Sequence, residues 1–266
     1  MATACPDEHP HPAMGESGSA GSAASRIAHH HSVTSTNTLA LQQARQGGRY
    51  PVWTLADEQI AGRGRHARKW HSPIGNLYAT RIVEASPPMV RITGLAFVAA
   101  LALHDAVSSL LNAQARHGLM LKWPNDLLAG GAKLAGILIE LEAADERIIA
   151  AVGIGVNVAA APPEGATSLA ALGCHASLDE VFEPLDRAFE ARLAEWNGGG
   201  GFAAIRAAWL DRALGRGEPT TVRTGGQVIC GRFAGLDDDG ALLLELDGGA
   251  MRRIAAGEVV GNGELG

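Results

Sequence analysis

Hydrophobic and polar positions follow two patterns in the first 214 residues. Short runs with the alternation of a strand are mixed with longer stretches whose apolar positions recur at helical spacing. We predict helices over 38–46, 91–115, 178–196 and 202–214, and strands over 51–56, 77–83, 119–123, 133–141 and 148–158. The last two strands are joined by a polar turn, as in a β-hairpin. Because hairpin-like pairs outnumber regular β-α-β units, we predict an α+β fold.

The pattern changes around residues 215–217. Residues 219–262 are short alternating segments separated by Asp- and Gly-rich turns, which predicts a small all-β domain of about five strands. At the other end, residues 1–26 are rich in Pro, Gly, Ser, Ala and His, a composition typical of disorder. We therefore divide the chain into a disordered tail (1–26), a main domain (27–214) and a small C-terminal domain (215–266).

Charge and cysteine content narrow the cellular setting. The formal net charge of −6 argues against a general affinity for nucleic acid or for an anionic membrane surface. The apolar run 92–103 is shorter than the roughly 20 residues that cross a bilayer, and the N-terminus lacks the pattern of a signal peptide. Cys5, Cys174 and Cys230 are far apart and odd in number, which favours reduced thiols. We predict a cytoplasmic protein with no membrane partner.

Two further motifs carry weak signals. Consecutive His29, His30 and His31 cannot easily converge on one ion, so we favour a solvated tail or strand edge and assign no metal ligands. The run from Gly153 to Asn157 lacks the third glycine and the helix of a dinucleotide-binding motif. Glycines in a strand instead suggest that a ligand or another backbone comes close.

A glycine-arginine loop over residues 62–70 is the first candidate for chemistry. It carries four cations and ends in Trp70, whose flat ring could stack on a base; the cations are Arg63, Arg65, Arg68 and Lys69. Guanidinium groups match phosphate and carboxylate oxygens, and the glycines permit close approach to a ligand. By itself the motif is also compatible with an RNA-binding segment or a plain solvated loop.

The second candidate is the sequence Lys-Trp-Pro-Asn-Asp over residues 122–126, followed by Lys133. Pro124 ends the strand, which leaves Lys122 and Asp126 at the edge of a turn. The structural alternative is a salt-bridged turn with Trp123 in the core. Exposed pairs of that kind contribute little to stability.

Taken in order, these motifs carry a family resemblance. Ser35-Thr36-Asn37, Gln59, the loop from Gly62 to Arg65, residues 122–126, Lys133 to Leu138 and Gly155 to Asn157 together resemble biotin protein ligases. The resemblance runs from about Ile27 to the end of the chain. It implies a mixed sheet flanked by helices, of the kind found in class II synthetases and biotin–lipoate ligases, followed by a small SH3-like β-barrel.

The resemblance also implies a reaction and a set of roles. Biotin and Mg²⁺-ATP would form biotinyl-5′-AMP, and a lysine of a biotin carboxyl carrier protein would then accept biotin. The implied biotin-binding residues are Ser35, Thr36, Asn37, Gln59, Arg63, Gly64, Arg65 and Lys133. The implied ATP- and adenylate-binding residues are Arg68, Trp70, Lys122 and Asn157. The implied catalytic residues are Lys133, Arg65 and Asp126, the last positioning the acceptor lysine or the metal.

Two departures from the family pattern stand out. Ala67 occupies a position where the family loop usually has glycine, and the turn over residues 72–76 is a residue shorter than in common versions. Only a polar tail precedes Ile27, where some members carry a DNA-binding helix-turn-helix, so we expect ligase activity without repressor function or DNA binding. We expect a monomer or homodimer.

Two other functions remain open at this point. A lipoate or octanoate ligase or transferase would share the fold. Enzymes of that kind lack the glycine-arginine loop, which disfavours this alternative. A binding module for single-stranded nucleic acid would use the loop arginines and Trp70 for backbone and stacking contacts. The acidic net charge disfavours that module.

Overall fold

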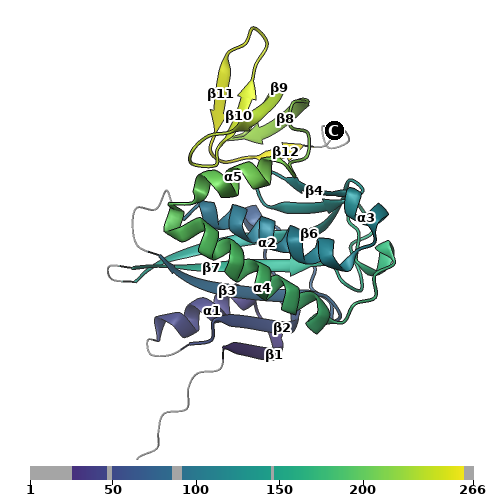
Figure 1. Ribbon diagram of the computed structural model, residues 1–266. Helices are drawn as coiled ribbons and strands as arrows, with labels where there is room; N and C mark the ends of the chain where they lie inside the picture. The colour runs from purple at the N-terminus through teal and green to yellow at the C-terminus, as the bar shows by residue number, and fades with distance from the viewer. Residues whose placement is uncertain (1–25, 47–49, 86–91, 145–146, 261–266) are drawn as a thin grey trace, which may run out of the picture.

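The larger of two β-sheets forms the body of the molecule. The computed structural model describes residues 26–46, 50–85, 92–144 and 147–260. Figure 1 shows the larger sheet with its helices and the smaller sheet beyond them. The larger sheet has the strand order β1-β2-β3-β7-β6-β5-β4. Its strands are β1 (Ile27–Val33), β2 (Trp53–Gln59), β3 (Leu77–Ala85), β4 (Leu119–Lys122), β5 (Asp126–Ala129), β6 (Ala132–Ala144) and β7 (Arg147–Val156).

The larger sheet is mixed, because its first two strands are parallel and joined by a helix. α1 (Thr36–Arg45) connects β1 to β2, which lie side by side in parallel. Parallel neighbours need such a crossover, whereas antiparallel neighbours can be joined by a short turn. The other neighbouring pairs are antiparallel, and β6 and β7 form the predicted hairpin.

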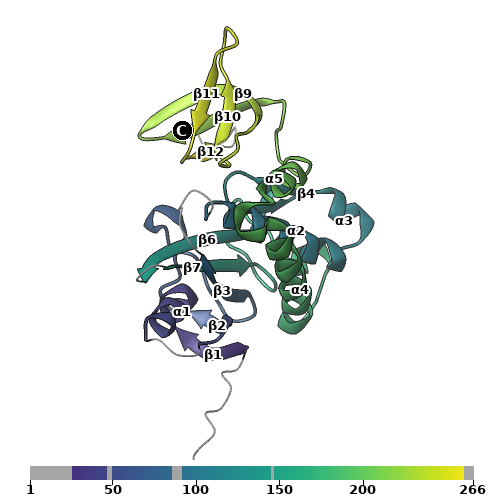
Figure 2. The same cartoon turned by 60° about the vertical axis from the view of Figure 1, so that its left-hand side comes forward.

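Helices pack on both faces of the larger sheet. α2 (Gly94–Leu110) and α4 (Leu178–Trp196) lie together on one face, and α5 (Phe202–Leu210) extends this layer toward the smaller sheet (Figures 1 and 2). α1 packs on the other face against Ile82, Ile149 and Ala151. Successive strand residues point to opposite faces, so the odd-numbered residues of β7 face α1.

The smaller sheet confirms the expected five-strand C-terminal unit. It is antiparallel, with the order β11-β10-β9-β8-β12. Its inner side chains, including Phe233 and Leu242, belong to the same apolar cluster as Trp209 of α5, so the two sheets share one core. The strands are β8 (Pro219–Thr224), β9 (Gln227–Leu236), β10 (Leu242–Glu245), β11 (Met251–Ile254) and β12 (Glu258–Val260).

The helix predicted over 91–115 is wrong in its extent, and its first residue lies outside the described ranges. α2 ends at Leu110, and a separate α3 (Ala113–His117) follows, because the Asn112 side chain accepts a hydrogen bond from Ala115 N at 3.0 Å and caps a new helix. The last helix ends at residue 210 instead of 214, since Leu214 N donates to Leu121 O beside β4. No helix in the described ranges is long and apolar enough to cross a bilayer.

The N-terminal histidines lie in β1, at one edge of the larger sheet, as the strand-edge interpretation predicted. His29 Nε2 and His31 Nδ1 lie 2.7 and 3.0 Å from the carboxylate oxygens of Asp57. Among the described residues, no group of three His, Cys, Asp or Glu side chains could hold a metal ion. Of the predicted disordered tail, residues 1–25 lie outside the described ranges.

Candidate active site

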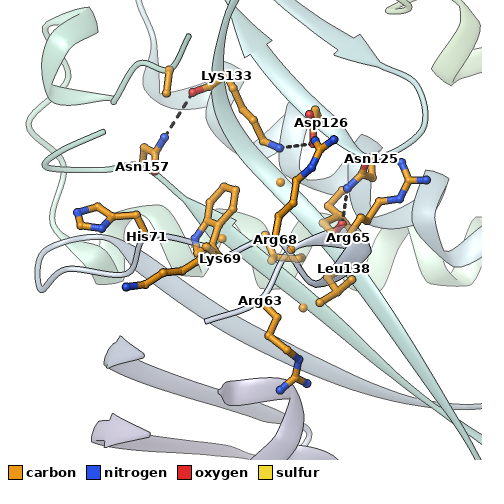
Figure 3. A pocket seen from close by; sticks show the side chains of 18 of the residues that line it. Arg63, Arg65, Arg68, Lys69, His71, Asn125, Asp126, Lys133, Leu138 and Asn157 are labelled. Carbon is orange, nitrogen blue, oxygen red and sulfur yellow. Dashed lines mark hydrogen bonds and ion pairs between the residues drawn. The ribbon is translucent and has the colours of Figure 1, made fainter. Parts of the chain in front are cut away.

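A cavity of about 530 Å³ lies on the α1 side of the larger sheet, under the glycine-arginine loop. Figure 3 shows the side chains of the loop cations together with Lys133 and Asp126 around it. The structure places all the residues that the resemblance assigned to binding or catalysis on its wall: Ser35, Thr36, Asn37, Gln59, Arg63, Gly64, Arg65, Arg68, Trp70, Lys122, Asp126, Lys133 and Asn157. Their individual roles stay predictions.

Glycines in β6 and β7 make the floor of this cavity. Gly155 lies opposite Gly136, and a Cβ at Gly155 would come within 2.7 Å of the Trp70 indole. A Cβ at Gly153 would lie 2.4 Å from Asn37 Oδ1. The sequence predicts that a ligand or another backbone approaches these glycines, whereas in the structure side chains of the loop and of α1 approach them. Glycine is needed where those side chains meet the sheet.

Polar side chains at the start of α1 are held by the neighbouring strands. Gln59 Oε1 accepts hydrogen bonds from the backbone N and the hydroxyl of Thr36 at 2.9 and 3.2 Å. Thr80 Oγ1 of β3 lies 2.8 Å from Thr36 Oγ1 and 2.7 Å from Asn37 Oδ1. Ser35 is the N-cap residue, yet its side chain makes no capping hydrogen bond. Ser35, Thr36, Asn37 and Thr80 are buried, and together with Gln59 they form a fixed polar wall.

The turn after β4 contains a cis peptide bond between Trp123 and Pro124. Trp123 is buried in the core, as the structural alternative predicted, and its Nε1 donates to Gly240 O at 3.2 Å. Asn125 donates to Ile137 O at 2.7 Å and accepts from Arg65 at 3.3 Å. The turn is thus tied to β6, to the loop and to the smaller sheet.

Lys133 and Asp126 form an ion pair at the cavity wall. Lys133 Nζ lies 2.7 Å from Asp126 Oδ1. The structural alternative, a turn salt-bridged between Lys122 and Asp126, is therefore wrong about the partner of Asp126. The two residues come from adjacent antiparallel strands, β6 and β5, where Asp126 lies opposite Gly136 and Lys133 lies opposite Leu128. Lys133 Nζ also lies 5.3 Å from the centroid of the Trp70 ring. A cation and a carboxylate therefore face the cavity from rigid elements.

The glycine-arginine loop is a short hydrogen-bonded hairpin. Gly64 N donates to Arg68 O at 2.8 Å, and Trp70 N donates to Gly62 O at 2.9 Å. Ala67 has φ of 57°, in the left-handed region that favours glycine. The residue that departs from the family pattern therefore occupies a position where glycine would be unstrained.

Two loop arginines reach the smaller sheet. Arg65 donates to Gly257 O at 2.9 Å, and Arg68 binds both carboxylate oxygens of Glu258 at 2.7 Å. Burial lowers the pKa of Arg65, while the charges of Asp126 and Glu258 oppose that shift. The hydrogen bond from Arg68 lowers the pKa of Glu258, against the opposite effect of burial. The loop is therefore held by groups nearly 200 residues away in the chain.

Several residues of the wall carried no signal in the sequence. Glu258 sits in a short C-terminal strand, and residues 162–166 form an irregular segment that lines the cavity beside Lys133.

Asn157 is predicted to lie near the adenine. Its amide donates to Thr167 O at 3.1 Å and to Lys133 O at 3.4 Å, so it also anchors the backbone of Lys133.

Both sheets match families of known proteins. Residues 30–158 match the Biotin/lipoate A/B protein ligase family, and residues 216–260 match the Biotin protein ligase C terminal domain. A biotin–[acetyl-CoA-carboxylase] ligase of Paracoccus denitrificans is 43% identical over 223 residues, which cover 79% of this chain and 90% of the relative. The chain belongs to the biotin protein ligase family.

Other members of the biotin protein ligase family support the same conclusion. A biotin–[acetyl-CoA-carboxylase] ligase of Mycobacterium tuberculosis is 36% identical over 237 residues, covering 85% of each chain. The Aquifex aeolicus biotin protein ligase, solved with biotin and ATP, superimposes with a TM-score of 0.71 at 26% identity, covering 88% of this chain and 97% of that one. The family resemblance and the predicted α+β fold, a mixed sheet flanked by helices, are confirmed.

Proposed function

We propose that this protein uses ATP to attach biotin to a lysine of a biotin carboxyl carrier protein, through biotinyl-5′-AMP. One observation carries the proposal: the loop cations, the Lys133–Asp126 pair and the polar wall of α1 surround a single cavity. The relatives named biotin–[acetyl-CoA-carboxylase] ligase support it, as does the related structure that holds biotin and ATP.

Biotin binding falls to the α1 side of the cavity. Biotin has a neutral ring with hydrogen-bond donors and acceptors and a carboxylate at the end of an apolar chain. The ring suits the polar wall of Ser35, Thr36, Asn37 and Gln59, since ligand sites place a few fixed polar groups in an otherwise apolar cavity. The carboxylate would then extend toward Lys133, with the loop residues 63–65 above it.

The first step joins two anions. A carboxylate oxygen of biotin attacks the α-phosphorus of ATP, a new P–O bond forms, and the bond to the bridging oxygen breaks as pyrophosphate leaves. Lys133 and Arg65 offset the charge that gathers around phosphorus, where preorganised cations accelerate such reactions most. Arg68, Trp70, Lys122 and Asn157 are assigned to the nucleotide side of the cavity.

The second step transfers biotin to the carrier. The neutral amine of the carrier lysine attacks the carbonyl carbon of the mixed anhydride, an amide forms, and AMP leaves. Asp126 lies beside Lys133 on the cavity wall. Its carboxylate would orient the incoming amine by accepting a hydrogen bond from it. A loop that covers the adenylate would exclude water from this labile intermediate.

Mg²⁺ is the expected companion of the ATP phosphates. Within the described part of the chain, no three metal-binding side chains converge into a metal site. Asp126 beside the cationic loop fits the usual arrangement, in which Mg²⁺ is held by substrate phosphates and one or two carboxylates. The ion would supply further positive charge to the polyphosphate.

Several wider aspects are part of the same proposal. We place the ligase reaction in residues 27–214, with residues 215–266 as a C-terminal domain that contacts the loop. We further propose a cytoplasmic enzyme without DNA-binding activity, active as a monomer or homodimer. The free thiols of Cys174 and Cys230 support a reducing location.

Pyrophosphate release tests the function directly. The protein with biotin and Mg²⁺-ATP should release pyrophosphate and retain biotinyl-AMP without any carrier, and adding a biotin carboxyl carrier domain should consume the intermediate. Lipoate, octanoate and single-stranded RNA serve as alternative ligands in parallel samples. Pyrophosphate that depends on lipoate but not on biotin would refute the assignment.

A further inference from the structure

Glu140 of β6 stands out among the acids near the cavity because the mechanism does not use it. Its carboxylate accepts a hydrogen bond from Asn37 Nδ2 at 2.8 Å. The same carboxylate receives Arg63 Nη2 at 2.8 and 2.9 Å, one distance to each oxygen. One side chain therefore touches both the polar wall of α1 and the first arginine of the loop.

The sheet register explains this double contact. Glu140 lies opposite Ala151 of β7, two residues along the strand from Leu138, which lies opposite Gly153. Gly153 leaves room for the Asn37 side chain, which then lies over the sheet and also donates to Leu138 O at 3.2 Å. Glu140 follows on the same face of the strand, so its carboxylate meets the amide of Asn37 from the side away from the cavity.

Arg63 differs in direction from the other loop arginines. Its Nη1 donates to Thr38 Oγ1 of α1 at 2.9 Å, so Glu140 and Thr38 together fix its guanidinium. Figure 3 shows Arg63 pointing away from Lys133 and Asp126, whereas Arg65 and Arg68 lie near that pair. The contacts of Arg63 therefore belong to the biotin end of the cavity and to the first turn of α1.

We propose that Glu140 is a positioning residue for biotin binding, which holds Asn37 against the sheet and joins the start of the loop to α1. The inference rests on the proposed ligase function. Without the Glu140 carboxylate, Asn37 would keep only its contacts with Leu138 O and Thr80 Oγ1, and Arg63 would lose its ionic partner beside the biotin ring. The phosphate end of the site, with Lys133, Arg65 and Arg68, would keep its own contacts.

The test compares two neighbouring glutamates on one face of β6. Glu140→Gln keeps size and one acceptor oxygen but removes the charge, and Glu142→Gln is the matched control, because Glu142 pairs with Arg45 at the far end of α1. Hydrogen bonds to charged groups are worth about 1.5–3 kcal/mol, so we expect the KM for biotin to rise roughly 10- to 100-fold in Glu140→Gln. The KM for ATP and kcat should change less than about twofold, and Glu142→Gln should match the wild type.

A second readout follows the loop itself. Trypsin should cleave after Arg63 faster in Glu140→Gln than in the wild type or in Glu142→Gln, because the guanidinium loses its ionic partner. Thr38→Val removes the other Arg63 contact and should speed the same cleavage, which keeps the test available if Glu140→Gln does not fold.

Three results would overturn the inference. The first is an equal rise of the KM values for biotin and ATP, and the second is an equal effect of Glu142→Gln. The third is unchanged cleavage after Arg63 in both Glu140→Gln and Thr38→Val. A wild-type protein that releases no biotin-dependent pyrophosphate would instead refute the ligase function, and that measurement comes first.

Discussion

The glycine-arginine loop and the Lys133–Asp126 pair bring charge to the same cavity by opposite means. Lys133 and Asp126 lie on the adjacent strands β6 and β5, and their side chains meet at 2.7 Å. The loop, in contrast, takes its position from distant partners, including Glu140 in β6 and Glu258 in β12. We propose that the fixed pair acts at the bond-making centre, whereas the loop, whose Arg65 also acts there, can release its distant partners to admit substrates.

Removing the fixed cation should have the largest effect. We expect Lys133→Ala to slow adenylate formation about 100-fold or more, since its charge counts most when negative charge gathers at phosphorus. Biotin binding, measured by calorimetry, should weaken much less. Arg147→Ala is the control, because it removes an exposed cation paired with Glu84 at the other end of the same hairpin. Equal losses in rate and binding would make Lys133 a binding residue only.

Removing a loop cation should release the intermediate instead. Arg65→Gly loses its contacts with Asn125 and Gly257, so we expect biotinyl-AMP to leave roughly tenfold faster while the fold remains intact. Free adenylate would then label lysines of bystander proteins, which a blot for biotin detects. Biotin should slow tryptic cleavage after Arg63 and Arg65 in the wild type. If the variant releases no free biotinyl-AMP and tryptic cleavage of the wild type is the same with and without biotin, the loop is only a solvated turn.

Filling the glycine floor should disturb the loop through the sheet. In Gly155→Ala the new Cβ would lie 2.7 Å from the Trp70 indole, so the ring must move, at a cost of about 1–3 kcal/mol. We expect a lower thermal midpoint and faster tryptic cleavage in the loop. Gly200→Ala is the control, since its nearest contact is an ordinary 3.4 Å. Unchanged cleavage in Gly155→Ala would show that Trp70 does not depend on the glycine floor.

The smallest effect is expected at the strained alanine. Ala67 has φ of 57°, so Ala67→Gly relieves backbone strain in the folded protein. This gain outweighs the loss of stability that comes from the greater freedom of glycine in the unfolded chain. We expect the hairpin to gain less than about 1 kcal/mol and to resist trypsin slightly better. Ala61→Gly, just before the loop, relieves no such strain and should have the opposite sign. Faster cleavage in Ala67→Gly would contradict this account.

The sequence alone predicted which residues line the cavity, but it did not predict the contacts of their side chains. The order of motifs from Ser35 to Asn157 predicted the family, and local alternation predicted the β6–β7 hairpin and the C-terminal strands, because these signals depend on neighbouring residues. Apolar periodicity failed at Asn112, where a side-chain cap interrupts an otherwise continuous pattern.

Only the tertiary structure decided how the site is assembled. The partners of the loop arginines come from β6 and β12, and no local pattern reports a contact across 77 or 190 residues. The glycines of β7 could be read as sites of close approach, but the approaching groups, Trp70 and Asn37, were set by the packing of the loop and α1 on the sheet. Composition and spacing act along the chain, whereas the cavity depends on sheet register and on the contact between the two sheets.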